Sequence, residues 1–161
     1  MHVKYSEAEL GQMIYPSIDV QNTDEFVAFQ VDVLFPPDWE LHGVNVLRTQ
    51  GHEFTYHEVE RGRVRILAYS FTNSPFVGNR GELIRLRLLP HQAGEYPIQL
   101  KDATLSSIEA INILDYTEDG YATIKEYPTH ITAPTIRYVA AGIILIIIIA
   151  AGIYALKKQD R

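Results

Sequence analysis

Apolar and polar residues alternate along most of this chain in short segments, which turn residues separate. The clearest alternation lies in segment 24–35. Five of its apolar residues fall on one predicted face: Val27, Phe29, Val31, Val33 and Phe35. Because successive side chains of a β-strand point to opposite sides, this period of two predicts a half-buried strand. The strand should end at Pro36, since proline has no backbone N–H to donate to a sheet.

Similar patterns predict more strands along residues 1–136, and none of these segments has a helical period. The further segments are 13–20, 39–48, 54–59, 63–71, 82–89, 96–100, at least one within 103–114, and 121–124. Gly43 stands where the phase of the alternation changes, which suggests a β-bulge. Short strands at this spacing, with no helices between them, predict an all-β fold, an antiparallel jelly-roll β-sandwich of about nine strands.

The pattern changes completely near the C-terminus. From Val139 to Leu156 every position is free of charge and of strongly polar groups. A helix of that length spans about 27 Å, close to the hydrocarbon thickness of a bilayer, and satisfies its own backbone in lipid. We therefore expect a transmembrane helix over 138–156. A Pro- and Thr-containing stalk (126–137) should link it to the β-sandwich (1–125), and a basic tail (157–161) should follow it.

The charge is distributed unevenly along the chain. Residues 1–136 carry ten basic and nineteen acidic residues, whereas 137–161 carry four basic and one acidic. An acidic domain argues against binding nucleic acid, because such affinity comes mainly from neutralising phosphates. Basic residues after a membrane span normally lie in the cytoplasm. We therefore expect a single-pass envelope protein whose C-terminus is cytoplasmic and whose β-sandwich lies outside, in the periplasm or at the cell surface.

The first residues, MHVKYSEAELGQ, lack the apolar core of a signal peptide. Three explanations fit this beginning. A signal could have been removed, this could be the last domain of a longer protein, or the protein could be tail-anchored with its domain in the cytoplasm. The charge distribution favours the first two explanations.

Few residues suggest catalysis or metal binding. The chain has no cysteine, which excludes disulfides and cysteine-based metal sites. It also has no G-x-S-x-G motif and no Gly-rich phosphate loop, so we expect no enzyme and no cofactor. His52, Glu53 and His57 form H-E-x-x-x-H, one residue longer than the helical zinc motif H-E-x-x-H. On a strand, positions five apart point to opposite faces, so no metal site is expected there.

Several motifs occur in a consistent order along residues 12–114. An F-x-A-F-Q-x-D strand (26–32) ends at proline, a Tyr-Ser strand end (69–70) precedes a Pro-Phe-x-Gly loop (75–78), and Gly-Glu-Leu (81–83) and G-x-Y-x-I (94–98) follow. In this combination the chain resembles cohesin-type domains, particularly the cohesin-like domains of Bacteroidetes surface proteins, here with a C-terminal transmembrane anchor. The resemblance implies a nine-stranded jelly roll.

The resemblance also implies binding rather than catalysis. Cohesins hold a protein partner, a dockerin module, on one flat sheet face. By position, that face would include Gln30 and Asp32 on the strand matching 26–35, and Asn79 and Arg80 in the turn matching 78–82. Gln30 and Asp32 would equally suit the solvated side of an ordinary strand.

Two other surface features bear on binding. Leu34, Leu67, Tyr69 and Phe71 fall outside the predicted core face, and exposed apolar patches often mark interaction sites. Loop 72–81 could carry binding residues, or its Phe76 could simply fill the core.

Alternative functions remain open for the same scaffold. A carbohydrate-binding module should present two or three coplanar exposed aromatic rings, for which the candidates are Trp39, Tyr56 and Tyr69. A spacer, or a structural subunit of a membrane complex, would need no such site. In either case the membrane is contacted through the C-terminal helix.

Overall fold

The computed structural model describes residues 1–126. The predicted transmembrane helix (138–156) and basic tail (157–161) lie outside the described residues, as does nearly all of the predicted stalk. Within residues 1–126, no helix is long and apolar enough to cross a membrane.

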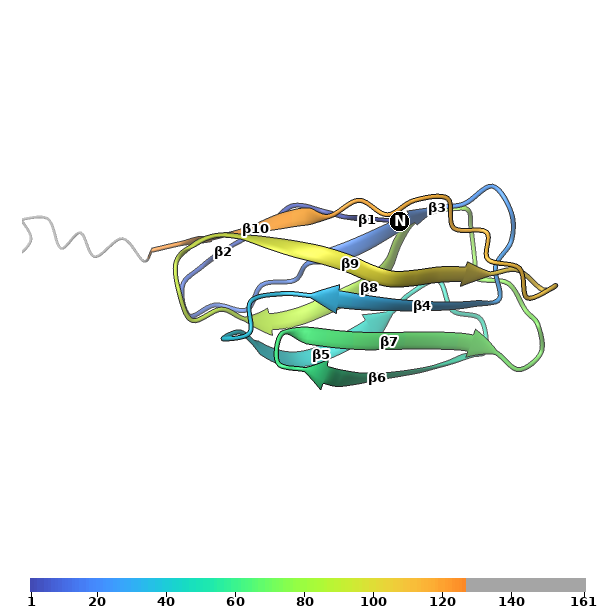
Figure 1. Ribbon diagram of the computed structural model, residues 1–161, viewed down its shortest axis with the longest axis horizontal. Coiled ribbons are helices and arrows are strands. Elements are labelled where there is room, and N and C mark those ends of the chain that lie inside the picture. The colour runs from blue at the N-terminus through green and yellow to red at the C-terminus, as the bar shows by residue number, and fades with distance from the viewer. Residues whose placement is uncertain (127–161) are drawn as a thin grey trace, which may run out of the picture. The chain divides into compact units, whose positions relative to one another are not determined.

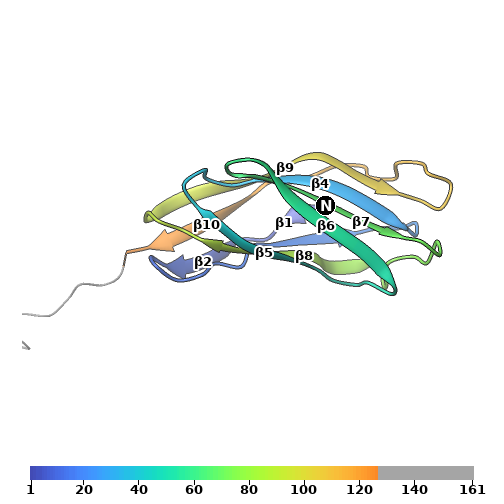
Figure 2. The ribbon, with the colours of Figure 1, turned by 90° about the horizontal axis from the view of Figure 1, so that it is seen from below.

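The described residues form two β-sheets that stack as the layers of a sandwich (Figures 1 and 2). One sheet has four antiparallel strands in the order β1 (His2–Val3), β3 (Ser17–Gln21), β8 (Arg80–Leu89) and β5 (Glu40–Val46). The other sheet has six strands in the order β2 (Ser6–Glu9), β10 (Gly120–Lys125), β9 (Gly94–Ser106), β4 (Ala28–Leu34), β7 (Arg63–Ser70) and β6 (His52–Glu60). Its pairs are antiparallel except β2 with β10, which is parallel.

The core lies between the sheets, on the faces that the alternation predicted. Phe29, Val31 and Val33 of β4 point inward and are buried, as are the inward residues of β8, Ile84, Leu86 and Leu88. Burial of these aliphatic and aromatic side chains is the main force that holds the sheets together. The all-β sandwich expected from the sequence is therefore confirmed.

The strand boundaries differ from the prediction in two places. The structure has ten strands rather than about nine, because β1 and β2 are short and carry no clear alternation. The segments expected as separate strands at 96–100 and within 103–114 belong to one long strand, β9. A bulge opposite Gln30 and Asp32, with Asp102 at a positive φ of 46°, shifts the phase within β9 and explains why it resembled two strands.

One detail of the prediction is confirmed, and one open alternative is decided. The register between β5 and β8 shifts between Leu41 and Gly43, so the bulge expected at Gly43 is present. Phe76 fills the core, because it is 4% exposed and its ring stacks on that of Phe26 at a centroid distance of 4.8 Å.

The chain leaves the sandwich at one end. Figure 1 shows β10 running outward at that end, while the turn from β7 towards β8 and the loop that follows β9 lie at the opposite end. The end of β10 and these two connections therefore lie at opposite ends of the sandwich.

Candidate functional site

The strands β9, β4, β7 and β6 are neighbours in the six-stranded sheet and present one face that is turned away from the core. Residues directly opposite each other in an antiparallel pair share a face, so the register defines which side chains lie there. Three rows cross β7, β4 and β9: Tyr69–Ala28–Ser106, Leu67–Gln30–Thr104 and Arg65–Asp32–Lys101. We call this surface the outer face.

Asp32 lies in the middle of the outer face but is covered. Its side chain is 0% exposed, because two arginines of β7 close over it. Arg65 Nε donates to Oδ1 at 2.6 Å and Arg65 Nη2 to Oδ2 at 2.9 Å, while Arg63 Nε donates to Oδ2 at 2.8 Å. Arg63 Nη2 also reaches Asp102 Oδ2 on β9 at 2.8 Å. The four side chains thus bridge β7, β4 and β9, and we call them the Asp32 network.

The network fixes the charge of its members. Hydrogen bonds from Arg65, opposed by burial and supported by those from Arg63, lower the pKa of Asp32. The same hydrogen bonds to Asp32 raise the pKa of Arg63 and of Arg65. Asp32 is therefore a permanent, fully paired anion at neutral pH, unsuited to exchanging protons. It anchors the strands, and its carboxylate is not free to contact a partner.

Beyond the network, the outer face becomes more apolar. Leu67 is 36% exposed beside the half-buried Gln30 and Thr104. Tyr69 packs edge-on against Phe71 at 5.0 Å, and Phe71 is 74% exposed just after β7. The outer face therefore combines a rigid charged part with an accessible apolar part, an arrangement typical of protein interfaces.

The four residues expected to bind a protein do not form one surface. Gln30 and Asp32 lie on the six-stranded sheet, whereas Arg80 begins β8 in the other sheet, where it pairs with Gln21. Asn79, exposed like Arg80, accepts a hydrogen bond from the backbone N–H of Asn22 at 2.9 Å. Of the four, only Gln30 is on the outer face with its polar group available.

Comparisons with known proteins give a consistent result at the level of structure. No protein-family model matches the sequence, and no curated protein matches it. A non-cellulosomal cohesin from the archaeon Archaeoglobus fulgidus superposes with a TM-score of 0.66 at 18% identity, over 76% of this chain and 88% of that one. The sixth cohesin of scaffoldin B from Acetivibrio cellulolyticus, in complex with a dockerin, gives 0.69 at 10% identity over 77% and 96%. A cohesin in a type I cohesin–dockerin complex from Clostridium thermocellum gives 0.67 at 12% identity over 78% and 92%.

The described domain has a cohesin-like fold. At identities of 10–18% the likeness concerns the fold. It agrees with the resemblance that the sequence motifs suggested.

The three aromatic residues considered for carbohydrate binding do not form a platform on this cohesin-like domain. Trp39 is 3% exposed and packs edge-on against Tyr96 at 5.2 Å, so it belongs to the core. Tyr69 lies opposite Glu53 on the outer face, whereas Tyr56 lies opposite Ile66 and points to the other side of its strand. The three rings are therefore neither coplanar nor all exposed.

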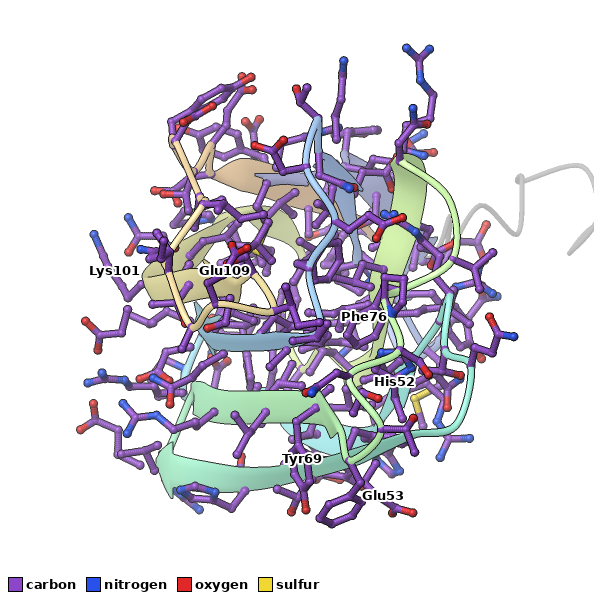
Figure 3. The ribbon with its side chains drawn as sticks, turned by 90° about the vertical axis from the view of Figure 1, so that its right-hand side faces the viewer. His52, Glu53, Tyr69, Phe76, Lys101 and Glu109 are labelled. Atoms are coloured by element: carbon purple, nitrogen blue, oxygen red, sulfur yellow. The ribbon has the colours of Figure 1, made fainter. Side chains whose placement is uncertain are left out.

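The two histidines of the H-E-x-x-x-H segment also separate, as expected for a strand. His52 packs against Phe76 (Figure 3), with 3.7 Å between ring centroids. His57 lies opposite Arg65 on the outer side. Burial lowers the pKa of His52, and its Nδ1 accepts a hydrogen bond from the backbone of Gln50 at 2.9 Å. Among residues 1–126, no group of three metal-ligating side chains is placed to hold an ion.

Sequence reasoning missed three residues of the outer face: Arg63, Arg65 and Asp102. The alternation in 63–71 did place Arg63 and Arg65 opposite the core residues Val64 and Ile66. The alternation could not show that β7 pairs with β4, and this pairing brings both arginines over Asp32. Outward-facing arginines together with an outward-facing aspartate in another strand were the available signal.

Proposed function

We propose that residues 1–126 are a non-enzymatic protein-binding domain that receives a protein partner on the outer face. The observation that carries this proposal is the accessible apolar strip of Leu67, Tyr69 and Phe71 beside the rigid Asp32 network. A preorganised sheet loses little conformational freedom on binding, which favours recognition by a flat surface. The polar groups of Gln30 and Thr104 would supply hydrogen bonds at the centre.

The structural neighbours support a protein as the partner. Two of the superposed cohesins are in complexes with dockerins. A dockerin-like module, or a subunit of an envelope complex, is the partner class that this likeness favours. The scattered aromatic candidates give no matching support to a carbohydrate ligand.

We further propose that the domain is held at the cell envelope by the apolar segment Val139–Leu156, with the C-terminus in the cytoplasm. The chain continues beyond residue 126 from one end of the sandwich. An anchor attached there would leave the outer face accessible from the side. Protease treatment of intact cells and of opened cells would test this topology. Digestion of the domain only after the cytoplasmic membrane is broken would contradict it.

The binding proposal is tested with the full-length protein in detergent, immobilised and exposed to an envelope extract of its source cells. Leu67→Arg places a charge in the apolar strip, and we expect at least about tenfold weaker binding of the identified partner. Tyr121→Arg is the matched control, since Tyr121 is 53% exposed on β10, outside the candidate strands. This variant should bind normally.

Two results would contradict the proposal. One is equal capture by Leu67→Arg and the unsubstituted protein, which would place the partner elsewhere. The other is binding of a glycan array without any captured protein, which would favour the carbohydrate alternative.

A further inference from the structure

Strand β6 is an unusually open edge of the six-stranded sheet. It has nine residues, and every residue from Glu53 to Glu60 is exposed. Figure 1 shows it as the outermost strand, and within residues 1–126 it pairs with β7 alone. Its other side therefore presents backbone N–H and C=O groups that no strand of the described domain uses.

Proteins usually protect such an edge from pairing with another chain. The common means are short strands, charged side chains (lysine above all), proline and bulges. The only one of these that β6 uses along its length is charge, from its three glutamates, and in the pairing described below Glu53 faces an imidazole. The other edges of the two sheets follow this rule: β1 has two residues, β2 has four, and β5 carries the bulge near Gly43. By contrast, β6 contains neither lysine nor proline, and its only register shift lies at its end, between Glu58 and Glu60.

The side chains of β6 are also more apolar than an exposed edge requires. Phe54 is 42% exposed, Tyr56 40% and Val59 45%. Phe54 and Tyr56 lie opposite Ala68 and Ile66, on the side of the sheet that faces the core, yet both rings remain partly accessible to solvent. A strand added alongside β6 would pack against these rings.

The sequence of β6 is complementary to itself when read in the opposite direction. In an antiparallel pair of two β6 strands centred on Thr55, Glu53 of each copy faces His57 of the other, and Phe54 faces Tyr56. Thr55 faces Thr55 at the centre. Carboxylate–imidazole, aromatic–aromatic and Thr–Thr pairs are among the combinations that stabilise antiparallel strands.

Other registers lack this complementarity. Centring the pair on Tyr56 places Glu53 against Val59 and Phe54 against Glu58. Centring it on Phe54 places Glu53 against Thr55. A slip by a single position would put core-side residues opposite outer-face residues, which breaks the alternation of a continuous sheet. The register centred on Thr55 is therefore the favoured one.

We propose that β6 is a homodimerisation edge, at which a second copy of this chain adds its own β6 antiparallel about a twofold axis at Thr55. The two six-stranded sheets then form one continuous sheet. Such an interface is isologous, so each favourable pair occurs twice and the assembly closes at two copies. This edge borders the apolar strip of Leu67, Tyr69 and Phe71, because Thr55 lies opposite Leu67 and Glu53 opposite Tyr69. The dimer uses the unpaired backbone of β6, so the cross-linking of Thr55→Cys tests it independently of partner binding by Leu67→Arg.

The absence of native cysteine allows a direct test with the full-length protein in detergent. Thr55→Cys puts two thiols at the axis, where Cβ atoms of directly opposite residues lie about 4.5–5.5 Å apart, a distance that little movement makes suitable for a disulfide. The matched control is Lys101→Cys, at an exposed position on β9 that is far from the edge (Figure 3). After mild oxidation, non-reducing electrophoresis should show about tenfold more linked dimer for Thr55→Cys than for the control.

The register is tested by exchanging charges in the Thr55→Cys protein. His57→Glu alone places the new carboxylate of each copy against Glu53 of the other. The amount of disulfide-linked dimer should then fall to that of the Lys101→Cys control. Adding Glu53→His restores the carboxylate–imidazole pairs in reverse, and the linked dimer should return. Far-ultraviolet circular dichroism checks that each variant is folded.

Two outcomes would overturn the proposal. In the first, Thr55→Cys yields no more linked dimer than Lys101→Cys, which would show that the axis residues do not meet. In the second, the linked dimer forms equally well with His57→Glu, which would show that the strands do not pair in this register.

Discussion

Replacing Asp32 by asparagine removes one negative charge from beneath two arginines and hardly changes the shape of the side chain. Asp32 is 0% exposed and accepts three hydrogen bonds from Arg63 and Arg65, at 2.8, 2.6 and 2.9 Å. In Asp32→Asn, the side-chain NH2 group replaces one acceptor oxygen, so its N–H donors would face the N–H donors of the two arginines. The variant therefore tests whether this residue holds β4 to β7 or serves a partner.

The expected cost follows from the environment of these bonds. Each hydrogen bond to a charged group contributes about 1.5–3 kcal/mol, and removing one partner of a buried pair costs more than removing an exposed one. Arg63 and Arg65 remain 26% and 35% exposed, so water compensates for part of the loss. We expect Asp32→Asn to lower the free energy of unfolding by about 2 kcal/mol, or the Tm by about 6–10 °C for a domain of this size.

The assay uses the fluorescence of Trp39, the one tryptophan of the chain, which is buried and reports on core unfolding. Asp102→Asn is the control, because Asp102 is 59% exposed and an exposed ion pair contributes only about 0–1 kcal/mol. A normal Tm together with lost partner binding in Asp32→Asn would refute the structural role and make Asp32 a contact residue.

The pH dependence of the same pair of proteins gives an independent check. The pKa of Asp32 is lower in the folded than in the unfolded state. Its contribution to the free energy of unfolding is therefore complete above the pKa of the unfolded state, about 3.9. It is lost as the pH falls through the lower folded value. The difference in stability between the unsubstituted protein and Asp32→Asn should therefore persist at pH 7 and pH 5 and narrow below about pH 4.

Two further substitutions, each with its own control, test the packing. Phe76→Ala leaves a cavity beside Phe26 and should cost about 3–4 kcal/mol of unfolding free energy, while Phe71→Ala, at a site 74% exposed, should change it by less than about 0.5 kcal/mol. Equal effects in thermal unfolding would contradict the assignment of Phe76 to the core. Gly62→Ala should cost more than the roughly 1–2 kcal/mol of a left-handed backbone alone, because its Cβ would lie 2.5 Å from the carbonyl oxygen of Phe35. Gly51→Ala has a similar φ and no atom within 4 Å, so a Tm loss as large as that of Gly62→Ala would refute the steric argument.

Much of the fold follows from local pattern. The faces of β4, β7 and β8 could be predicted because a half-buried strand needs apolar residues at every second position. The shortest strands, β1 and β2, could not be predicted, because two to four residues are too few to establish a period. The single long strand β9 could not be predicted for a different reason: its bulge shifts the phase of the alternation.

The candidate site was less accessible to sequence reasoning. Gln30 and Asp32 were correctly placed opposite the core face of their strand, but their different environments depend on which strands lie beside β4. The arginines that cover Asp32 are 31 and 33 residues away in the chain. Likewise, Tyr56 and Tyr69 were both candidate surface aromatics, and only the register of β6 with β7 shows that they point to opposite sides.

The amino-acid pattern alone shows that this is an all-β domain, which side of each main strand faces the core, and that a long apolar segment follows the domain. These properties depend on neighbouring residues along the chain, and a periodic pattern records them. The folded arrangement was needed to show that Asp32 is a buried, paired anion, that Trp39 is in the core and that β6 is an open edge. Those properties depend on pairing between distant strands, which hydrophobic periodicity leaves undefined because many strand orders satisfy the same pattern.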